Sequence, residues 1–413
     1  MKSLRELYRV GPGPSSSHTL APKIACIKFK EAFKACCAYK VDLYGSLSLT
    51  GKGHFTDLII KQCLGDNTII NFYENWNEKH PNGFYISGFD SFNNVIGKWT
   101  VFSIGGGAIS IKECEEFAQD VYNEKSFDEI KKYCNDNNLS IVEYVTLKDQ
   151  GIDMYLENIL EKMIESVDRG INSSGILPGS LKVEKVAKSL YENAKVVEDS
   201  EHRKKLLLMS YAYAASEENA SMGIVVTAPT LGACGVLAAM MYYLYKEIKV
   251  SKEKLINALK VAGIFGNLIK ENATISGAVG GCQAEIGSAC VMASAAYAYI
   301  NDLELNQIEC AAEIAMEHHL GLTCDPVEGY VIIPCIERNA VGVLRSFDAC
   351  LLAKHMTKFK RNRISFDMVV NTMHYTGQKI TVELKETSLG GLAKEFNKKE
   401  CTYLEINNGE KYE

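Results

Sequence analysis

The sequence predicts a multi-domain protein in which an α+β N-terminal domain precedes a mostly all-α C-terminal domain. With 413 residues, the chain is longer than one ordinary hydrophobic core allows and suits two domains. Segments with the pattern of β-strands lie before about residue 105, whereas almost every long segment after about residue 155 has helical spacing. We therefore expect domains at residues 1–145 and 146–400, followed by a tail at residues 401–413.

The composition argues against polyanionic partners. Hydrophobic residues make up 47% of the chain and charged residues 23%, and the net charge is only −6. Because no long basic run is present, we expect neither nucleic acid nor a membrane as a partner. The first residues lack the apolar core of a signal peptide, and the longest apolar runs are shorter than the roughly 20 residues of a membrane span. We therefore expect a cytoplasmic protein whose 14 cysteines are thiols or metal ligands.

Four segments in the N-terminal part have the pattern of strands. They are residues 39–44, 68–73, 83–88 and 98–104. The last of them ends in three glycines, residues 105–107, which a tight turn explains as well as a phosphate-binding loop does. The pattern of the sequence then changes from strand-like segments to helical spacing, and we place the boundary between the domains between about residues 136 and 150.

A serine-rich segment leads from a glycine-proline turn into a helix and is the first candidate site. Apolar residues recur at helical spacing from residue 25 to residue 33. The entrance of a helix offers free backbone N–H groups and the positive end of the helix dipole, both of which favour an anion. An N-cap needs only one serine. Because Ser15, Ser16, Ser17, His18 and Thr19 occur in a row, we favour a site for a carboxylate or a phosphate over a plain cap.

His54 is the second candidate and lies in a polar loop with several glycines at residues 45–57. A helix is expected to begin directly after this loop. A lone histidine in a loop is more often a surface residue than a catalytic one. Because Lys52, Thr56 and Asp57 lie nearby, a catalytic role and a surface position are about equally good interpretations of His54.

Three cysteines form the third candidate. Residues 321–340 contain Cys324 and Cys335 in a run without sustained helical or strand period, and Cys282 begins a helix, where the dipole favours a thiolate. Their spacing matches no short zinc module, whereas three scattered thiolates can hold a four-iron cluster and leave one iron open. From the spacing alone, a cluster is only a modestly better interpretation than cysteines that merely pack in the core. A zinc ion bound by the three cysteines is the next interpretation. Most other cysteines are assigned to packing, namely Cys26, Cys36, Cys37, Cys63, Cys114, Cys134, Cys290, Cys310 and Cys350.

Eight segments, in chain order, carry a resemblance to a known family. They are residues 10–19, 51–57, 103–107, 217–220, 227–230, 281–287, 321–340 and 385–393. Together they resemble the bacterial iron–sulfur L-serine dehydratases in their single-chain form. Several long motifs in one order are far more specific than any single pattern, and they span nearly the whole chain.

The resemblance implies an enzyme in which a β-type domain is followed by an all-α domain that carries a [4Fe-4S] cluster. By position, Cys282, Cys324 and Cys335 match the cluster ligands, His54 matches the proposed base, and residues 15–19 match a loop that approaches the substrate. The implied reaction converts L-serine to pyruvate and ammonia without pyridoxal phosphate, in amino-acid catabolism and gluconeogenesis. A related lyase acting on L-threonine or L-cysteine, and a non-catalytic metal-stabilised homologue, are the alternatives, and a homodimer is left open.

This chain departs from the family pattern at three positions. Leu231 stands where many members have Asn, Phe55 where Ala is common, and Glu328 where Gly is frequent. These departures leave the preference among serine, threonine and cysteine open. The family's best-described members end in a cysteine thought to block the open iron, whereas here Cys401 lies well before the end, so this role is not carried over.

Overall fold

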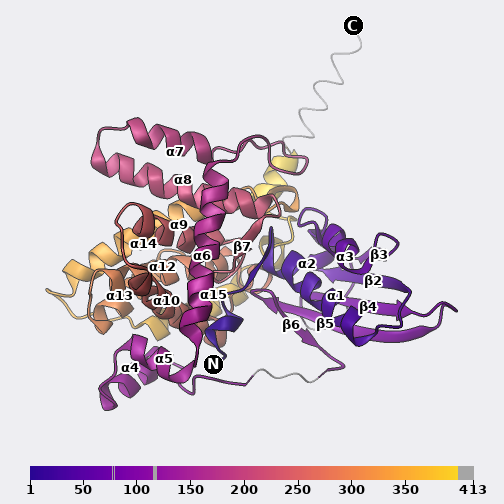
Figure 1. The fold of residues 1–413 in the computed structure, drawn as a ribbon, viewed down its shortest axis with the longest axis horizontal. Helices are drawn as coiled ribbons and strands as arrows, with labels where there is room; N and C mark the ends of the chain where they lie inside the picture. The colour runs from indigo at the N-terminus through magenta and orange to yellow at the C-terminus, as the bar shows by residue number, and fades with distance from the viewer. Residues whose placement is uncertain (77, 79, 115–118, 399–413) are drawn as a thin grey trace, which may run out of the picture.

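The computed structural model describes residues 1–76, 78, 80–114 and 119–398, so the expected tail with Cys401 lies outside the described residues. Figure 1 shows two parts side by side, a sheet flanked by helices and a larger assembly of helices. The protein is therefore multi-domain with mixed α and β content. Within the described ranges, no helix has both the length and the hydrophobicity that crossing a membrane requires.

The smaller part is a five-stranded sheet with the order β3-β2-β4-β5-β6. Strands β2 and β3 are parallel, and the other neighbours are antiparallel. The strands are β2 (Ala38–Gly45), β3 (Ile69–Tyr73), β4 (Asn82–Phe89), β5 (Val95–Gly105) and β6 (Ala108–Ile111), and the helices are α1 (Ala21–Ala32), α2 (Ser46–Leu49) and α3 (Thr56–Leu64). All four segments expected to be strands are confirmed.

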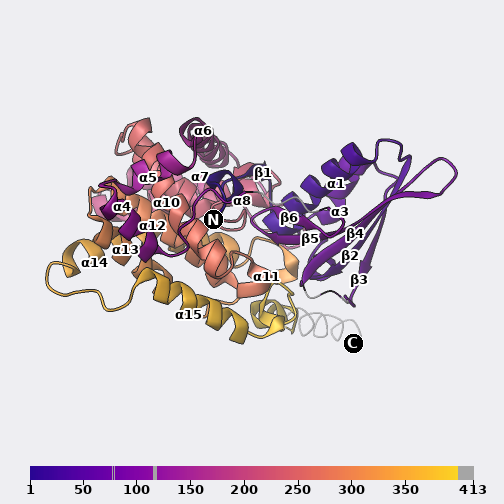
Figure 2. The ribbon, with the colours of Figure 1, turned by 90° about the horizontal axis from the view of Figure 1, so that it is seen from below.

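Helices α1 and α3 cover one face of this sheet, as Figure 2 shows for α1. The alternation along β2 buries Val41 and Leu43 completely, and they share a core with Phe29 of α1 and Ile60 of α3. Phe29 meets Trp99 of β5 edge to face, with ring centroids 5.2 Å apart. This packing fixes both helices, and therefore the loops that precede them, relative to the sheet.

The three glycines at residues 105–107 form the turn between β5 and β6. Their φ angles are +96°, +58° and +79°, a region that residues with a side chain rarely adopt. The backbone carbonyl of Gly106 accepts a hydrogen bond of 2.9 Å from Arg9 Nη1. The interpretation as a tight turn is therefore confirmed.

The larger part consists mainly of helices. They are α4 (Phe127–Asp136), α5 (Ile141–Lys148), α6 (Ile152–Ile171), α7 (Ala187–Val196), α8 (Ser200–Ala220), α9 (Cys234–Lys246), α10 (Lys252–Asn272), α11 (Gly277–Gly280), α12 (Ser288–Ile300), α13 (Leu305–Glu317), α14 (Cys335–Met356) and α15 (Phe366–Lys379). This part also contains strand β7 (Ile224–Val226), which pairs antiparallel with β1 (Val10–Pro12) near the start of the chain.

The first residues of the chain pack into the helical core and not against the sheet. Leu4 and Leu7 are completely buried, and their side chains lie against Gly263 and Gly266 of α10. A Cβ atom at either glycine would come within 3.0 Å of these leucines, so the close approach depends on the missing side chains. The same core continues from Tyr122 through α4 and α5 into α6, so the packing does not change at residue 145.

Asp149 anchors the first residues to the end of α5. Its carboxylate is 2% exposed and accepts hydrogen bonds from Ser3 Oγ (2.7 Å), the Leu4 N–H (2.9 Å), Arg5 Nη1 (2.6 Å) and the Tyr122 hydroxyl (3.2 Å). We expect Asp149→Ala to lower the free energy of unfolding by about 3 kcal/mol, because several buried donors lose a charged acceptor. Denaturant titration would measure the change.

The exposed residue Asp136 provides a matched control for this prediction. Its replacement by alanine should change the free energy of unfolding by less than about 0.5 kcal/mol. Equal losses in the two variants would show that Asp149 does not anchor the N-terminal segment.

Candidate active site

The two parts of the molecule meet around a small cavity lined by candidate residues from distant segments. Ser15, His54, Cys282, Cys324 and Cys335 all line it. Two carboxylates that the sequence analysis did not single out, Glu285 and Glu386, line it as well. The structure therefore brings residues from each of the three candidate sites to one place.

The serine-rich segment enters α1 through a π-helical turn at Ser16–Leu20. Ser15 is the N-cap, and its hydroxyl accepts a hydrogen bond of 3.2 Å from the His18 N–H. The hydroxyl of Ser16 accepts from the Leu231 N–H (2.7 Å), and the hydroxyl of Thr19 donates to the His54 carbonyl (2.8 Å). These two hydroxyls hold the loops together, whereas Ser15 faces the cavity.

His18 is completely buried and its hydrogen bonds define its tautomer. Its Nε2 atom lies 3.1 Å from Ser46 Oγ and 3.0 Å from Thr50 Oγ1. Both hydroxyls donate their own protons to backbone carbonyls, so they accept a hydrogen bond from His18 Nε2–H. His18 Nδ1 then accepts from the Ser17 hydroxyl at 2.8 Å. Burial, followed by the proximity of His54, lowers the pKa of His18.

His54 is 1% exposed and stacks on His18, with ring centroids 4.3 Å apart and an angle of 21° between the rings. Its Nδ1–H donates to the Thr50 carbonyl at 2.8 Å, so Nε2 carries the lone pair in the neutral ring. Burial lowers the pKa of His54 to about 4. The imidazole is therefore neutral at neutral pH, as a general base must be.

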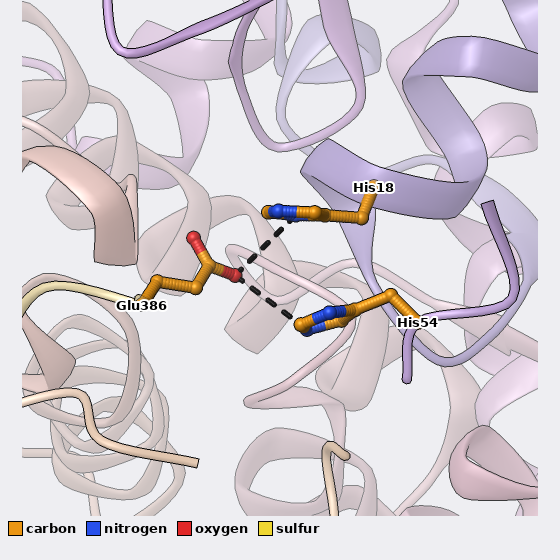
Figure 3. Close-up of side chains that lie close together, drawn as sticks. All are labelled: His18, His54 and Glu386. Atoms are coloured by element: carbon orange, nitrogen blue, oxygen red, sulfur yellow. Dashed lines mark ion pairs between the residues drawn. The ribbon is translucent and has the colours of Figure 1, made fainter. Parts of the chain in front are cut away.

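Glu386 faces both histidines, as Figure 3 shows. Its Oε1 atom lies 3.6 Å from His18 Nδ1 and 3.8 Å from His54 Nε2. Burial, and then the proximity of Cys282, raise the pKa of Glu386 to about 8, while the nearby Ala278 N–H and Ser17 hydroxyl act in the opposite direction. The Oε2 atom itself has no partner with hydrogen-bond geometry among the described residues.

The backbone around Glu386 is joined to the loop that carries Cys324. The Cys324 N–H donates to the Leu384 carbonyl (2.8 Å), and the Glu386 N–H donates to the Cys324 carbonyl (2.7 Å). The Glu386 carbonyl accepts from Ser46 Oγ at 2.8 Å, which ties this segment to the sheet part. Glu386 lies in one of the eight family motifs, but nothing in the local sequence indicated that its side chain would face the two histidines.

His18, His54 and Glu386 form the one group of three His, Cys, Asp or Glu side chains in the described residues whose ligand atoms all lie within 4.8 Å of one another. Two imidazoles and a carboxylate are a donor set that suits a metal ion. His18 Nδ1, however, already accepts a hydrogen bond from the Ser17 hydroxyl at 2.8 Å, so its lone pair is engaged. This geometry favours proton handling over metal binding by the trio.

The three cysteines approach the cavity from three segments. Cys282 precedes a π-helical turn at Gln283–Gly287 that leads into α12, Cys324 follows α13, and Cys335 is the first residue of α14. A hydrogen bond from Cys324 and the nearby Arg338 guanidinium lower the pKa of Cys282 to about 6, against the effect of burial. Hydrogen bonding to Cys282 together with burial raises the pKa of Cys324, and burial raises that of Cys335.

The three thiols form a donor set that can be compared with the needs of a metal centre. All three line the same cavity, and the Arg338 guanidinium lies close enough to compensate part of the thiolate charge. Because thiolate sulfur is a soft donor, this donor set fits a metal cofactor held by cysteines.

The cysteines assigned to packing divide into three groups. Cys26, Cys134, Cys290, Cys310 and Cys350 are buried, which confirms their assignment to packing. Cys36, Cys63 and Cys114 are half-buried. Cys37 is exposed, so its assignment to packing was wrong, because it lies just outside the core that α1 forms with the sheet.

The three positions that depart from the family pattern have different surroundings. Glu328 is exposed, has a φ of +50°, and accepts a hydrogen bond from Ser180 Oγ, so it links two loops and does not line the cavity. Phe55, with a φ of +55°, lies beside the ring of Tyr330, and Leu231 is completely buried.

Comparison with known proteins identifies the family. Residues 111–393 match the sequence model of the serine dehydratase alpha chain, and residues 3–68 match that of the serine dehydratase beta chain. The chain belongs to the serine dehydratase family. The family resemblance inferred from the eight sequence segments is thereby confirmed.

Relatives in this family align along almost the whole chain. The L-serine dehydratase of Haemophilus influenzae is 37% identical and L-serine dehydratase 1 of Escherichia coli is also 37% identical, each alignment covering 95% of this chain and 99% of the relative. The L-serine dehydratase of Helicobacter pylori is 36% identical over 95% of this chain and 98% of its own length. The chain thus includes both serine dehydratase regions in one polypeptide.

Proposed function

We propose that this protein is an L-serine ammonia-lyase that converts L-serine to pyruvate and ammonia. The observation that carries the proposal is the convergence of a neutral, buried histidine and three cysteines on one cavity. The relatives' names, L-serine dehydratase, support the same reaction.

Cys282, Cys324 and Cys335 would hold a [4Fe-4S] cluster. When bound, such a cluster with one open iron supplies a Lewis acid that makes hydroxide a better leaving group. The position of all three cysteines on one cavity and the charge of Arg338 support this assignment, because three protein thiolates leave one iron of the cluster open.

His54 acts as the base. Its Nε2 atom accepts the α-proton of L-serine, and its Nδ1–H keeps the ring oriented through the Thr50 carbonyl. The electron pair of the broken C–H bond forms the Cα=Cβ double bond as the C–O bond breaks and hydroxide leaves. The resulting aminoacrylate tautomerises to an imine, which water hydrolyses to pyruvate and ammonia.

The serine-rich segment binds the carboxylate of the substrate. Ser15 faces the cavity, and Ser16, Ser17, His18 and Thr19 keep the segment in place through the contacts described above. Hydroxyl donors at a helix entrance suit a carboxylate because the helix dipole and free N–H groups favour negative charge.

Anaerobic reconstitution with iron and sulfide, followed by an assay of serine-dependent pyruvate formation, tests the proposal. Iron, labile sulfide and zinc would be measured in the same samples. Release of 2-oxobutyrate from L-threonine and of sulfide from L-cysteine would define the substrate preference. Full occupancy by zinc without labile sulfide, and no pyruvate from L-serine, would refute the assignment.

The pH dependence of kcat should lack an acidic inflection near the usual histidine pKa. Because burial lowers the pKa of His54 to about 4, the base stays unprotonated as the pH falls from about 7 to about 5. The titratable groups that face it are His18 and Glu386. The measurement is kcat at saturating L-serine, with the metal content checked at each pH. An inflection near the usual value of about 6.5 would contradict the assignment of His54 as the base.

A further inference from the structure

One carboxylate oxygen in the cavity is buried and has no partner. Glu386 is 5% exposed, lines the cavity, and its Oε2 atom forms no hydrogen bond with the described residues. We propose that Glu386 binds the α-ammonium group of the substrate and so restricts the site to α-amino acids. This inference rests on the proposed function and assigns the part of the site that recognises the amino group.

The energetics of an unpaired buried acceptor support a missing ligand. Leaving such a group without a partner costs about 1–3 kcal/mol, and more for a charged group. An ammonium group brings three N–H donors and a positive charge, so it supplies the missing hydrogen bond and favours the ionised carboxylate against the effect of burial. No lysine or arginine is among the residues that line the cavity in the described part of the chain, so a cationic ligand group has no competitor there.

The position of Glu386 beside His54 matches the chemistry of the substrate. In an α-amino acid, the ammonium nitrogen and the α-hydrogen are attached to the same carbon atom. Glu386 Oε1 lies 3.8 Å from His54 Nε2, so an ammonium group held by Oε2 of the same carboxylate brings the α-hydrogen next to the base. The same contact therefore both selects the substrate and orients it for proton transfer.

Glu285 is the competing acceptor in the cavity. Its Oε2 atom already lies 4.0 Å from the Cys324 sulfur. Glu285 thus points toward the cysteines, whereas Glu386 points toward the base. These contacts assign the ammonium group to Glu386, and Glu285→Gln becomes a comparison variant.

Substitution of the Glu386 side chain should leave its segment in place. The backbone is held by the hydrogen bond from the Glu386 N–H to the Cys324 carbonyl and by the one from Ser46 Oγ to the Glu386 carbonyl. Glu386→Gln keeps the shape and removes the charge. Glu386→Asp keeps the charge and provides a second variant if the first loads metal poorly.

The test compares two unreactive ligands on the metal-loaded enzyme by calorimetry. L-alanine has the α-ammonium group but no leaving group, whereas 3-hydroxypropionate has the hydroxyl and carboxylate of L-serine but no ammonium group. We expect Glu386→Gln to raise the Kd of L-alanine by about 10- to 100-fold, because a charge-assisted hydrogen bond is lost. The Kd of 3-hydroxypropionate should change by less than about threefold.

Matched controls separate recognition of the charge from damage to the site. Glu383→Gln changes an exposed carboxylate of the same segment and should alter neither Kd. Glu386→Asp should keep the preference for L-alanine over 3-hydroxypropionate that the unsubstituted enzyme shows. Metal content is measured in every variant.

Several outcomes would overturn the inference. They are equal weakening of both ligands in Glu386→Gln, unchanged affinity for L-alanine, loss of the preference in Glu386→Asp, and selective loss in Glu285→Gln instead. An enzyme that forms pyruvate from L-serine but shows one of these results refutes this inference alone. Absence of pyruvate in the unsubstituted enzyme would refute the proposed function itself.

Discussion

Replacing His54 with alanine is expected to lower kcat for pyruvate formation by about 10²- to 10⁴-fold, while the metal remains bound. The reason is that Nε2 of this neutral ring is the acceptor placed beside Glu386 at the cavity, and alanine has no atom that can take the α-proton. Steady-state kinetics with L-serine, together with iron and labile sulfide analysis, would measure both effects.

The exposed histidine His202 supplies the control for this experiment. His202→Ala should leave kcat within about twofold of the unsubstituted enzyme, since surface substitutions rarely affect a distant site. A near-normal kcat in His54→Ala would show that another group removes the α-proton. A loss of metal in that variant would instead indicate that His54 supports the metal centre.

Cys335→Ala is expected to abolish the metal centre and, with it, all detectable turnover. Three thiolates leave no spare ligand, because among the described cysteines only Cys282, Cys324 and Cys335 line the cavity. Iron and labile sulfide per chain after anaerobic reconstitution are the direct readouts, and the visible absorption of the purified protein is a second one.

Cys290→Ala is the matched control, since Cys290 is completely buried in α12, the helix that follows Cys282. It should keep the metal and most of the activity, although a small cavity in the core will cost some stability. Full iron and sulfide content in Cys335→Ala would remove Cys335 from the ligand set.

Much of the fold could be predicted because its signals are local. The strands at residues 39–44 and 98–104 show their alternation within a few residues, and the glycines at residues 105–107 mark the turn that follows. The order of eight motifs identified the family, which no single spacing could have done.

Features that depend on contacts between distant segments could not be predicted. Leu4 and Leu7 carry no local sign that they belong to a core built around α10. Glu386 is one acidic residue among many in the sequence. It reaches the cavity only because its backbone, with a φ of +58° at Glu386, pairs with the distant Cys324 loop. Periodicity reports which face of an element is apolar, but not which remote element will cover it.

The pairing of Leu384 and Glu386 with Cys324 also bears on how the protein is made. A ribosome releases the chain from its N-terminus, so the sheet, His18, His54 and the three cavity cysteines emerge before this segment. The Cys324 loop gains its backbone partners, and His54 gains its carboxylate neighbour, only after residues 384 and 386 have been synthesised. A nascent chain that stops before residue 384 therefore contains Cys282, Cys324 and Cys335 but lacks both the backbone partners of the Cys324 loop and the carboxylate beside His54.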